Sequence, residues 1–440
     1  MLQHDIRQRL FHGHLELLPQ MNEIYELELA FAESQALSEK ALVHHGAYFA
    51  SVKGVATNHF RLCAGESMHL PDGTAIKRRQ FFERNQFRTG YATHGLFPYR
   101  GKFHPQMVKG ILNAMGLRPG ECVLDPMMGS GTTLVEAAVM GIDAKGFDVS
   151  PFCQFMASTK IDGLRVALEP LDRAVRESGL LFRFFGDVAG AKIKLLGTAD
   201  GYRPDILPQG MAAEWFAPKV WGILLLAYLD SVGFAERSSR QKPNVQFRGI
   251  LEKYAAVARR IQQGLAALDI ATGHAQAQQG DARCLPLAAS SIDGILFSPP
   301  YSFAVDYVEN DAPHLRLLGA NLDELRGRMV GLRGQSLREK FEGYIKDMQQ
   351  VLAECARVLR PGRCCAIVIG TNRNQLGEVF DQDPAEVEGL DLQMIRLAEA
   401  VGLKFTRRFE RRIVGLANTM RDEDILLLQK VSDESGTRSL

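Results

Sequence analysis

The 440-residue sequence is poor in cysteine, and its few cysteines lack the spacing of a metal or disulfide framework. There are seven, and no two of them form a CxxC pair: Cys63, Cys122, Cys153, Cys284, Cys355, Cys364 and Cys365. A zinc ribbon needs closely paired cysteines, and a secreted disulfide scaffold normally has an even number. We therefore expect buried thiols in a reducing compartment and no metal site.

Long apolar runs are also missing. The longest is Val220–Leu229, which ends at Asp230, whereas a transmembrane helix needs about 20 apolar residues. The first residues, MLQHDIRQRLFHGHLELL, lack the unbroken apolar core of a signal peptide. These absences predict a cytoplasmic protein that makes no membrane contact, and they leave the oligomeric state open.

The sequence has no excess of charge of either sign, since 52 basic residues face 51 acidic ones and the net charge is +1. This balance neither favours nor excludes an acidic partner, so any basic surface must be local. Hydrophobic residues make up 46% of the chain, which is enough for a sizeable core. The length fits one large domain with insertions, or two domains.

From Gly120 onward, short apolar runs alternate with helical stretches. Cys122–Leu124 ends in Asp125-Pro126 and leads through a glycine loop to a helix, and Ala144–Phe147 ends in Asp148. This alternation predicts a βαβ unit and a parallel sheet. Further on, a helix over residues 337–359 should lead through a Pro-Gly turn at 361–362 into a strand over 364–369. A short turn near the end predicts an antiparallel pair of strands over 404–414 and 424–430. The predicted fold class is α/β, with a Rossmann-like sheet.

The rest of the chain divides around this sheet. Residues 1–90 read as a helical segment followed by a basic arm, because residues 51–104 hold nine Lys or Arg against three acids and no helical period. Residues 91–160 and 276–440 hold the two halves of the sheet domain. Residues 161–275 read as a mainly helical insertion between them.

The segment VLDPMMGSGTT, residues 123–133, stands where a strand meets a helix. Gly129 and Gly131 permit a tight turn and let a ligand approach the backbone, and a helix N-terminus favours a carboxylate or phosphate. Asp148, 17 positions beyond Gly131, ends the next strand, where it suits two ribose hydroxyls. A dinucleotide loop would need a third glycine where Leu134 stands, and a P-loop would need a lysine. The remaining alternative is a purely structural turn.

Ser298-Pro299-Pro300-Tyr301 follows the apolar run Ile292–Phe297, so it should lie at the carboxyl edge of the sheet. A proline carbonyl and the serine hydroxyl can both accept hydrogen bonds from an NH2 group and hold its lone pair toward a methyl donor. Tyr301 offers a flat face on which an unstacked base can lie. The alternative is a proline-rich turn with a partly buried tyrosine.

Together these segments resemble the amino-group class of DNA methyltransferases, which use S-adenosylmethionine. DPMMGSGTT resembles the cofactor loop of that class, and FSPPY its catalytic motif in the form associated with cytosine-N4 methylation. THGLFPYRGKFHPQ, residues 93–106, is similar to the segment that closes over the methionine end of the cofactor, and Gly280-Asp281-Ala282 to the position that meets the adenine amine. The order of the motifs differs from that of many N4-cytosine enzymes, since here the cofactor loop comes first. About 165 residues separate the two motifs.

The resemblance implies a fold, a cofactor and a set of site residues. The fold is the S-adenosylmethionine-dependent methyltransferase sheet, and the catalytic residues are Ser298, Pro299, Pro300 and Tyr301. The implied cofactor-binding residues are Lys102, Asp125, Pro126, Gly129, Gly131, Thr132, Thr133, Asp148, Val149, Asp281 and Ala282. The expected reaction is methylation of a base amine in DNA, with cytosine N4 as the expected position and adenine N6 as an alternative.

Two other functions stay open at this point. One is methylation of a base amine in tRNA or rRNA, and the other is nucleic-acid binding on a silenced methyltransferase scaffold. Whether a restriction endonuclease partner exists is also open.

Phosphate contacts of a nucleic-acid substrate should come from local basic clusters. Residues 231–262 hold seven basic groups against two acids. The candidates there are Arg237, Arg240, Lys242 and Arg248. A further cluster comprises Arg407, Arg408, Arg411 and Arg412. The alternative for each single arginine is an ordinary solvated position.

Overall fold

The computed structural model describes residues 10–11, 13–18, 21, 23–63, 91–99, 101–190, 209–237, 242–300, 306–412 and 422–432. Tyr301, Arg240, Arg100 and residues 64–90 of the predicted basic arm lie outside the described residues, as does the side chain of Arg237. No helix within the described ranges is long and apolar enough to span a membrane.

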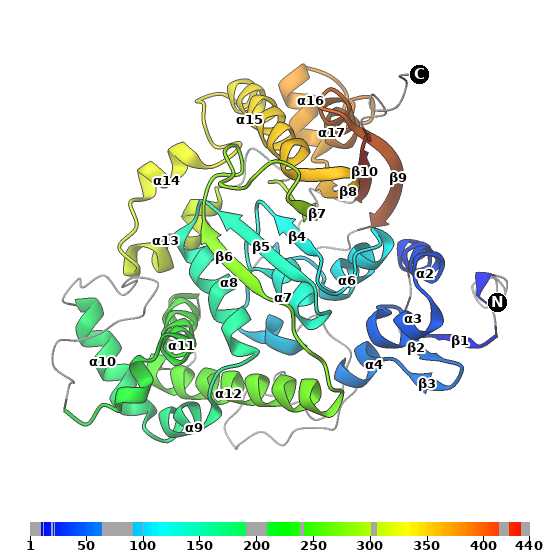
Figure 1. Cartoon of the computed structure of the whole chain (residues 1–440). Coiled ribbons are helices and arrows are strands. Elements are labelled where there is room, and N and C mark those ends of the chain that lie inside the picture. The colour runs from blue at the N-terminus through cyan, green and yellow to red at the C-terminus, as the bar shows by residue number, and fades with distance from the viewer. Residues whose placement is uncertain are drawn as a thin grey trace.

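A seven-stranded sheet forms the centre of the molecule, with the strand order β6-β5-β4-β7-β8-β10-β9 (Figure 1). Its strands are β4 (Cys122–Asp125), β5 (Asp143–Asp148), β6 (Ala275–Gln279), β7 (Ile292–Phe297), β8 (Leu359–Gly370), β9 (Leu403–Arg412) and β10 (Asp422–Lys430). The first five in spatial order pair in parallel, and β10 is antiparallel to both β8 and β9. The predicted α/β fold class with its antiparallel C-terminal pair is confirmed.

The strand order reverses between β4 and β7. From β4 the chain moves outward to β5 and β6, and it then returns to the other side of β4 to form β7 and β8. Open α/β sheets bind their ligands outside the carboxyl ends of the strands at such a reversal. The loops after β4, β5, β6 and β7 are therefore placed around one crevice.

Helices cover both faces of the sheet, and the alternation of side chains along the strands explains why. Val123 packs toward α2 (Ile24–Ala36), α6 (Pro105–Ala114) and α7 (Thr132–Val139), whereas Leu124 packs toward α15 (Leu337–Val358), α16 (Arg373–Phe380) and α17 (Leu390–Glu399). Cys364 and Cys365 divide between the two faces in the same way, as a strand period of two requires.

One strand differs from its sequence prediction. The strand β8 begins at Leu359 and continues through Pro361-Gly362, where a separating turn was predicted. The register between β7 and β8 shifts between Ile292 and Gly294, and residues 360–362 are exposed. Proline and glycine are tolerated there because this part of the strand lies outside the regular ladder.

Five helices between β5 and β6 build a separate apolar core, at the lower left of Figure 1. They are α8 (Pro151–Gly163), α9 (Leu168–Arg176), α10 (Ser178–Gly190), α11 (Pro218–Arg237) and α12 (Pro243–Ala267). Ser150 caps α8 by accepting a hydrogen bond from the Cys153 amide at 3.3 Å, and Pro151 follows it, as serine and proline commonly do at a helix start. The helices α13 (Tyr307–Leu317) and α14 (Leu322–Arg328) pack onto the same core.

The N-terminal part is more regular than its sequence suggested. The strands β1 (Leu15–Leu17), β2 (Phe49–Val52) and β3 (Val55–Ala56) form a second sheet, flanked by α3 (Glu39–His45) and α4 (Asn58–Cys63). The interpretation of residues 51–63 as an extended arm is therefore wrong. Short strands and a six-residue helix give too little periodicity to be recognised in a sequence, and packing against the main domain stabilises them.

Candidate active site

The glycine loop joins β4 to α7 at the carboxyl edge of the sheet. Gly129 and Gly131 have positive φ angles of 46° and 75°, which glycine adopts at little cost. A Cβ added to Gly131 would lie 2.7 Å from the Cβ of Ala157 in α8. Gly131 therefore lets α7 and α8 pack closely, whereas Gly129 faces the crevice.

Asp148 ends β5 beside this loop, and its carboxylate organises the loop. One oxygen accepts from the Gly129 amide at 3.0 Å, and the other accepts from the Ser150 amide at 2.9 Å. Burial raises the pKa of Asp148 to about 6, and the two amide hydrogen bonds limit the rise. Two oxygens offer about four acceptor positions, so the carboxylate can still accept from two further hydroxyls.

A cavity of about 480 Å³ opens at this edge, within the size range of small-molecule sites. It joins the two predicted motifs, because its lining includes both the cofactor-loop residues and the residues after β7. The predicted residues that line it are Lys102, Pro126, Gly129, Thr132, Asp148, Val149, Asp281, Ala282, Ser298, Pro299 and Pro300.

Three predicted cofactor residues do not line this cavity: Asp125, Gly131 and Thr133. Asp125 is only 2% exposed, and its carboxylate accepts from the Met127 amide at 3.1 Å. Burial raises the pKa of Asp125 to about 7. These residues support the loop and do not line the cavity. The position of a residue within the motif therefore did not by itself distinguish ligand contact from support of the loop.

Asp281 lines the cavity at the end nearest β6, and it is held by Arg283. The guanidinium of Arg283 bonds both Asp281 oxygens at 2.9 and 2.7 Å and reaches Asp347 at 2.9 Å. Burial by itself would raise the pKa of Asp281, but the hydrogen bonds and charge of Arg283 outweigh it and lower the pKa. Asp281 is thus an ionised acceptor in a fixed orientation.

The residues after the catalytic motif divide between a helix cap and the cavity. Asp306 caps α13 by accepting from the Glu309 amide at 2.9 Å. Tyr307 and Asp311 line the cavity, and Asp311 accepts a hydrogen bond of 3.3 Å from the Tyr99 hydroxyl. Burial raises the pKa of Asp311 to about 7, so this carboxyl can exchange a proton near neutral pH.

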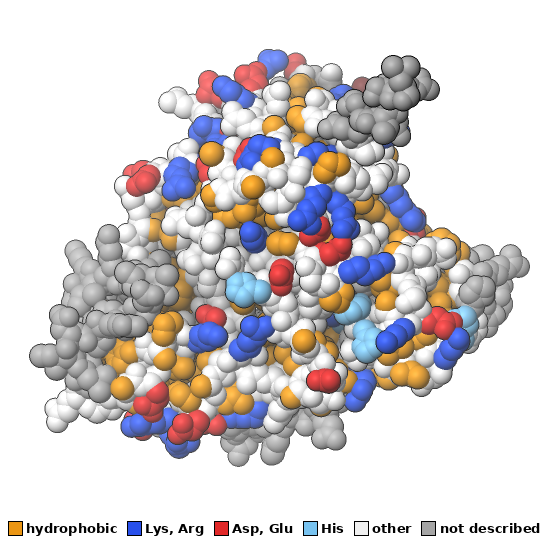
Figure 2. Space-filling view, viewed as in Figure 1, with side chains coloured by type: hydrophobic (Ala, Val, Ile, Leu, Met, Phe, Trp, Pro, Cys, Tyr) orange, Lys and Arg blue, Asp and Glu red, His pale blue; other side chains and the backbone are white. Residues whose placement is uncertain are grey.

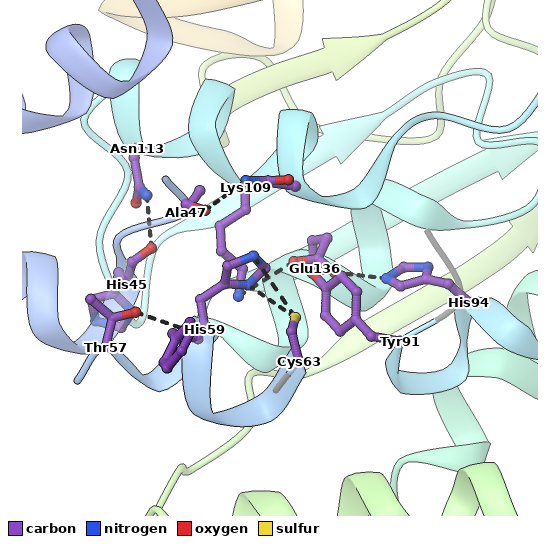
Figure 3. Close-up of polar contacts among 12 residues, drawn as sticks. His45, Ala47, Thr57, His59, Cys63, Tyr91, His94, Lys109, Asn113 and Glu136 are labelled. Carbon is purple, nitrogen blue, oxygen red and sulfur yellow. Dashed lines mark hydrogen bonds and ion pairs between the residues drawn. The ribbon is translucent and has the colours of Figure 1, made fainter. Parts of the chain in front are cut away.

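A buried polar network holds the segment that carries Lys102 and Tyr99. Figure 3 shows Glu136 of α7 between Tyr91, His94 and Lys109. The Tyr91 hydroxyl donates to Glu136, His94 Nε2 lies 2.7 Å from one Glu136 oxygen, and Lys109 Nζ lies 3.5 Å from the other. Burial would raise the pKa of Glu136, but these partners lower it to about 2. Lys102 Nζ then donates to the His94 carbonyl at 3.2 Å, so His94 has a structural role.

Of the predicted nucleic-acid residues, Arg411 lines this cavity, whereas Lys242, Arg248 and Arg408 are not part of its lining. Lys242 is exposed at the start of α12, and Arg248 is exposed and pairs with Glu252 at 3.0 Å. On β9, Arg408 pairs with Asp391 at 2.6 Å, so it is not an ordinary solvated group. Figure 2 shows Lys and Arg spread over one face with acidic side chains among them. A contact of these residues with nucleic acid stays a prediction.

Comparisons with known proteins agree with this geometry. Residues 96–177, which include the glycine loop, match the RMKL-like methyltransferase domain family. The type II methyltransferase M.MjaII of Methanocaldococcus jannaschii is 47% identical over 68 residues, and M.BsoBI of Geobacillus stearothermophilus is 33% identical over 110. The matched segment is therefore similar to methyltransferase domains. The family model covers the glycine loop, the segment for which S-adenosylmethionine is the expected cofactor.

These matches are partial. They cover 16% and 25% of this chain and only 13% and 21% of M.MjaII and M.BsoBI, respectively. A tRNA (guanine(10)-N2)-dimethyltransferase of Methanothermobacter thermautotrophicus is also similar, with 36% identity over 53 residues, 12% of this chain and 16% of that protein. The shared region is thus a fraction of each relative.

Proposed function

We propose that this protein transfers a methyl group from S-adenosylmethionine to the exocyclic amine of a base in DNA, with cytosine N4 as the position. The observation that carries the proposal is the shared cavity, in which Asp148 and Asp281 line one part and Ser298-Pro299-Pro300 another. The first part fits the ribose and adenine of the cofactor, because it offers carboxylate acceptors beside a glycine loop. The second part offers acceptors for an amine.

The residues of the chain then supply position and orientation. Bound S-adenosylmethionine supplies an electrophilic methyl group on a sulfonium. The Ser298 hydroxyl and the Pro299 carbonyl accept hydrogen bonds from the NH2 group of the base and direct its lone pair to that methyl. Tyr301 stacks on the base. Such positioning replaces a nucleophilic side chain, because a correctly oriented amine attacks directly. The proton that the amine loses passes to solvent.

DNA is the favoured substrate because two of the similar proteins are named type II methyltransferases. Ser298, where adenine-N6 enzymes more often carry aspartate, supports cytosine as the base. The tRNA methyltransferase that is also similar favours an RNA base amine as the second candidate. The insertion between β5 and β6, with the basic residues of α12, is the proposed surface for the nucleic-acid backbone.

Nucleoside analysis tests this proposal. The purified full chain should be incubated with methyl-labelled cofactor and with DNA or RNA, and the nucleosides should be identified by mass spectrometry. We expect N4-methylcytosine in DNA. N6-methyladenine alone, or label only in RNA, would refute the cytosine-DNA assignment, and a Ser298→Ala variant with undiminished turnover would refute the role of the motif.

A further inference from the structure

The far end of the cavity contains an arginine that neither motif includes. The strand order places the cofactor residues over β4, β5 and β6, and Ser298 at the end of β7. On the other side of β7 come β8, β10 and β9, so a base whose amine is held at Ser298 must lie over these strands. Neighbouring strands are about 4.8 Å apart, so β9 lies roughly 14 Å beyond β7, a distance that a pyrimidine ring and an arginine side chain can bridge together with the hydrogen bonds at each end.

Arg411 and Glu423 lie at that place. Arg411 stands near the end of β9 and Glu423 near the start of β10, and the two are directly paired in register. Glu423 also pairs with Gly370, the last residue of β8. Because β10 runs against β8, its first residues lie at the same carboxyl edge as Ser298. Both Arg411 and Glu423 line the cavity.

The contacts of Arg411 hold its guanidinium but leave its Nε without an acceptor in the described part of the chain. Its Nη1 lies 2.7 Å from a Glu423 oxygen, and its guanidinium carbon lies 5.6 Å from the centre of the Tyr25 ring of α2. The Arg411 side chain is 22% exposed and that of Glu423 is 5% exposed. The buried Nε of Arg411 has no acceptor among the described residues. A buried N–H without an acceptor is costly, so the position of Arg411 is not explained by its internal contacts alone. Because its side chain lines the cavity and is partly exposed, a ligand there can accept from the guanidinium.

The position excludes the adenosine part of the cofactor as this acceptor, because Asp148 and Asp281 mark that part over β5 and β6. What lies next to Ser298 on the Arg411 side is the target base. Cytosine has an acceptor nitrogen, N3, on the ring next to the carbon that carries the amine, and adenine has N1 in the equivalent place. Arginine is a frequent donor to base acceptors because its charge strengthens the bond and its planar fork fixes the direction.

We propose that Arg411 donates a hydrogen bond to the ring nitrogen next to the amine-bearing carbon of the target base, and that Glu423 is the positioning residue that holds Arg411 for this contact. The inference rests on the proposed function and deepens it. The bond orients the ring so that the amine meets Ser298. It also selects bases with an unprotonated nitrogen at that place.

A paired test uses a substrate analogue and a conservative variant. The DNA duplex carries cytosine or 3-deazacytosine, in which N3 is replaced by C–H, at the methylated position. Arg411→Lys retains the charge beside Glu423 and Tyr25 but removes Nε. We expect the analogue to lower kcat/KM of the wild type by about 10- to 100-fold, the range for loss of a charge-assisted hydrogen bond. Arg411→Lys should lose a similar factor on cytosine and lose no more than about twofold further on the analogue. If the product is N6-methyladenine, 1-deazaadenine serves in the same way.

Arg360→Lys is the matched control, because Arg360 lies near the start of β8, at the opposite edge of the sheet, and pairs with Asp293 outside the cavity lining. It should keep wild-type kcat/KM and the full analogue effect. Thermal unfolding and cofactor affinity should be unchanged in Arg411→Lys.

Several results would overturn the inference. They are an analogue effect as large in Arg411→Lys as in the wild type, a loss of cofactor affinity in that variant, or a salt dependence of DNA binding flattened by about 0.9, which indicates that the residue binds a phosphate. A wild type that methylates no nucleic acid would instead refute the proposed function, and the wild-type reaction on unmodified DNA distinguishes that failure.

Discussion

Replacing Asp148 by asparagine should weaken cofactor binding by a predictable amount. The two carboxylate oxygens already accept from the Gly129 and Ser150 amides, at 3.0 and 2.9 Å. The remaining acceptor positions are those that the ribose hydroxyls of the cofactor can use. An asparagine side chain has no charge and only one of the two oxygens. Loss of a charge-assisted hydrogen bond costs about 1.5 to 3 kcal/mol, so Kd should rise about 10- to 150-fold.

The pH dependence gives this prediction a second, independent readout. Burial raises the pKa of Asp148 to about 6, and it is the ionised form that accepts from the ribose. Affinity is therefore complete above pH 6 and is lost as the pH falls through that value, by up to about tenfold per pH unit. The variant has no carboxyl at this position, so its affinity should lack this step. Asp125 and Asp311, with pKa values of about 7, remain in both proteins, and the charge of Asp148 contributes to raising both values. In the variant their titrations should therefore shift to lower pH while the step near pH 6 disappears.

Isothermal calorimetry from pH 5 to pH 8 measures both effects, with circular dichroism to show that the variant is folded. Asp143→Asn is the matched control. Asp143 begins the same strand, and its carboxylate accepts from the His274 amide at 2.8 Å, but it lies at the opposite edge of the sheet. The control should bind the cofactor as the wild type does. If Asp148→Asn keeps the wild-type Kd and pH profile, Asp148 does not contact the cofactor.

Three further predictions concern packing, catalysis and DNA binding. Gly131→Ala should lower the free energy of unfolding by roughly 2 to 4 kcal/mol in urea denaturation, because its Cβ would meet α8 at 2.7 Å. Gly116→Ala has the same φ of 75° with open space around it, and an equal loss there would show that the approach to α8 is irrelevant. Tyr301→Ala should reduce turnover far more than cofactor affinity, and a folded variant that loses cofactor binding instead would contradict the stacking role. For DNA binding, three basic residues should be neutralised together: Arg237, Arg240 and Lys242. The slope of the salt dependence of DNA binding should then flatten by roughly 0.9 for each phosphate that is no longer bound. An unchanged slope would indicate that the insertion has only a structural role.

Much of the cofactor end of the site could be predicted from the sequence. Gly129, Asp148 and Ser298 each come directly after a short apolar run, and parallel strands bring all such positions to one edge of a sheet. The alternation of strands and helices predicts that arrangement without knowledge of any long-range contact. The antiparallel strand pair at the C-terminus followed from equally local signals.

Local signals failed where a short element depends on its neighbours. Nothing in residues 51–63 has the length or period of a stable element, yet they form a hairpin and the helix α4. Gly131 belongs to a motif that is typical of ligand contact, but its lack of a Cβ makes room for Ala157 of α8. In both cases the deciding atoms belong to segments far away in the sequence.

Sequence alone therefore determined the sheet, the strand-end motifs and the class of cofactor, because each depends on residues within one strand, loop and helix. Only the tertiary structure decided which charged groups meet in the cavity. The hydrogen bond between Tyr99 and Asp311 joins positions 212 residues apart. Arg411 reads in the sequence as one of several arginines on an edge strand, and it reaches the cavity because β10 turns back beside β8 and brings Glu423 next to it. Such contacts between distant residues depend on long-range strand pairing, which no local sequence pattern indicates.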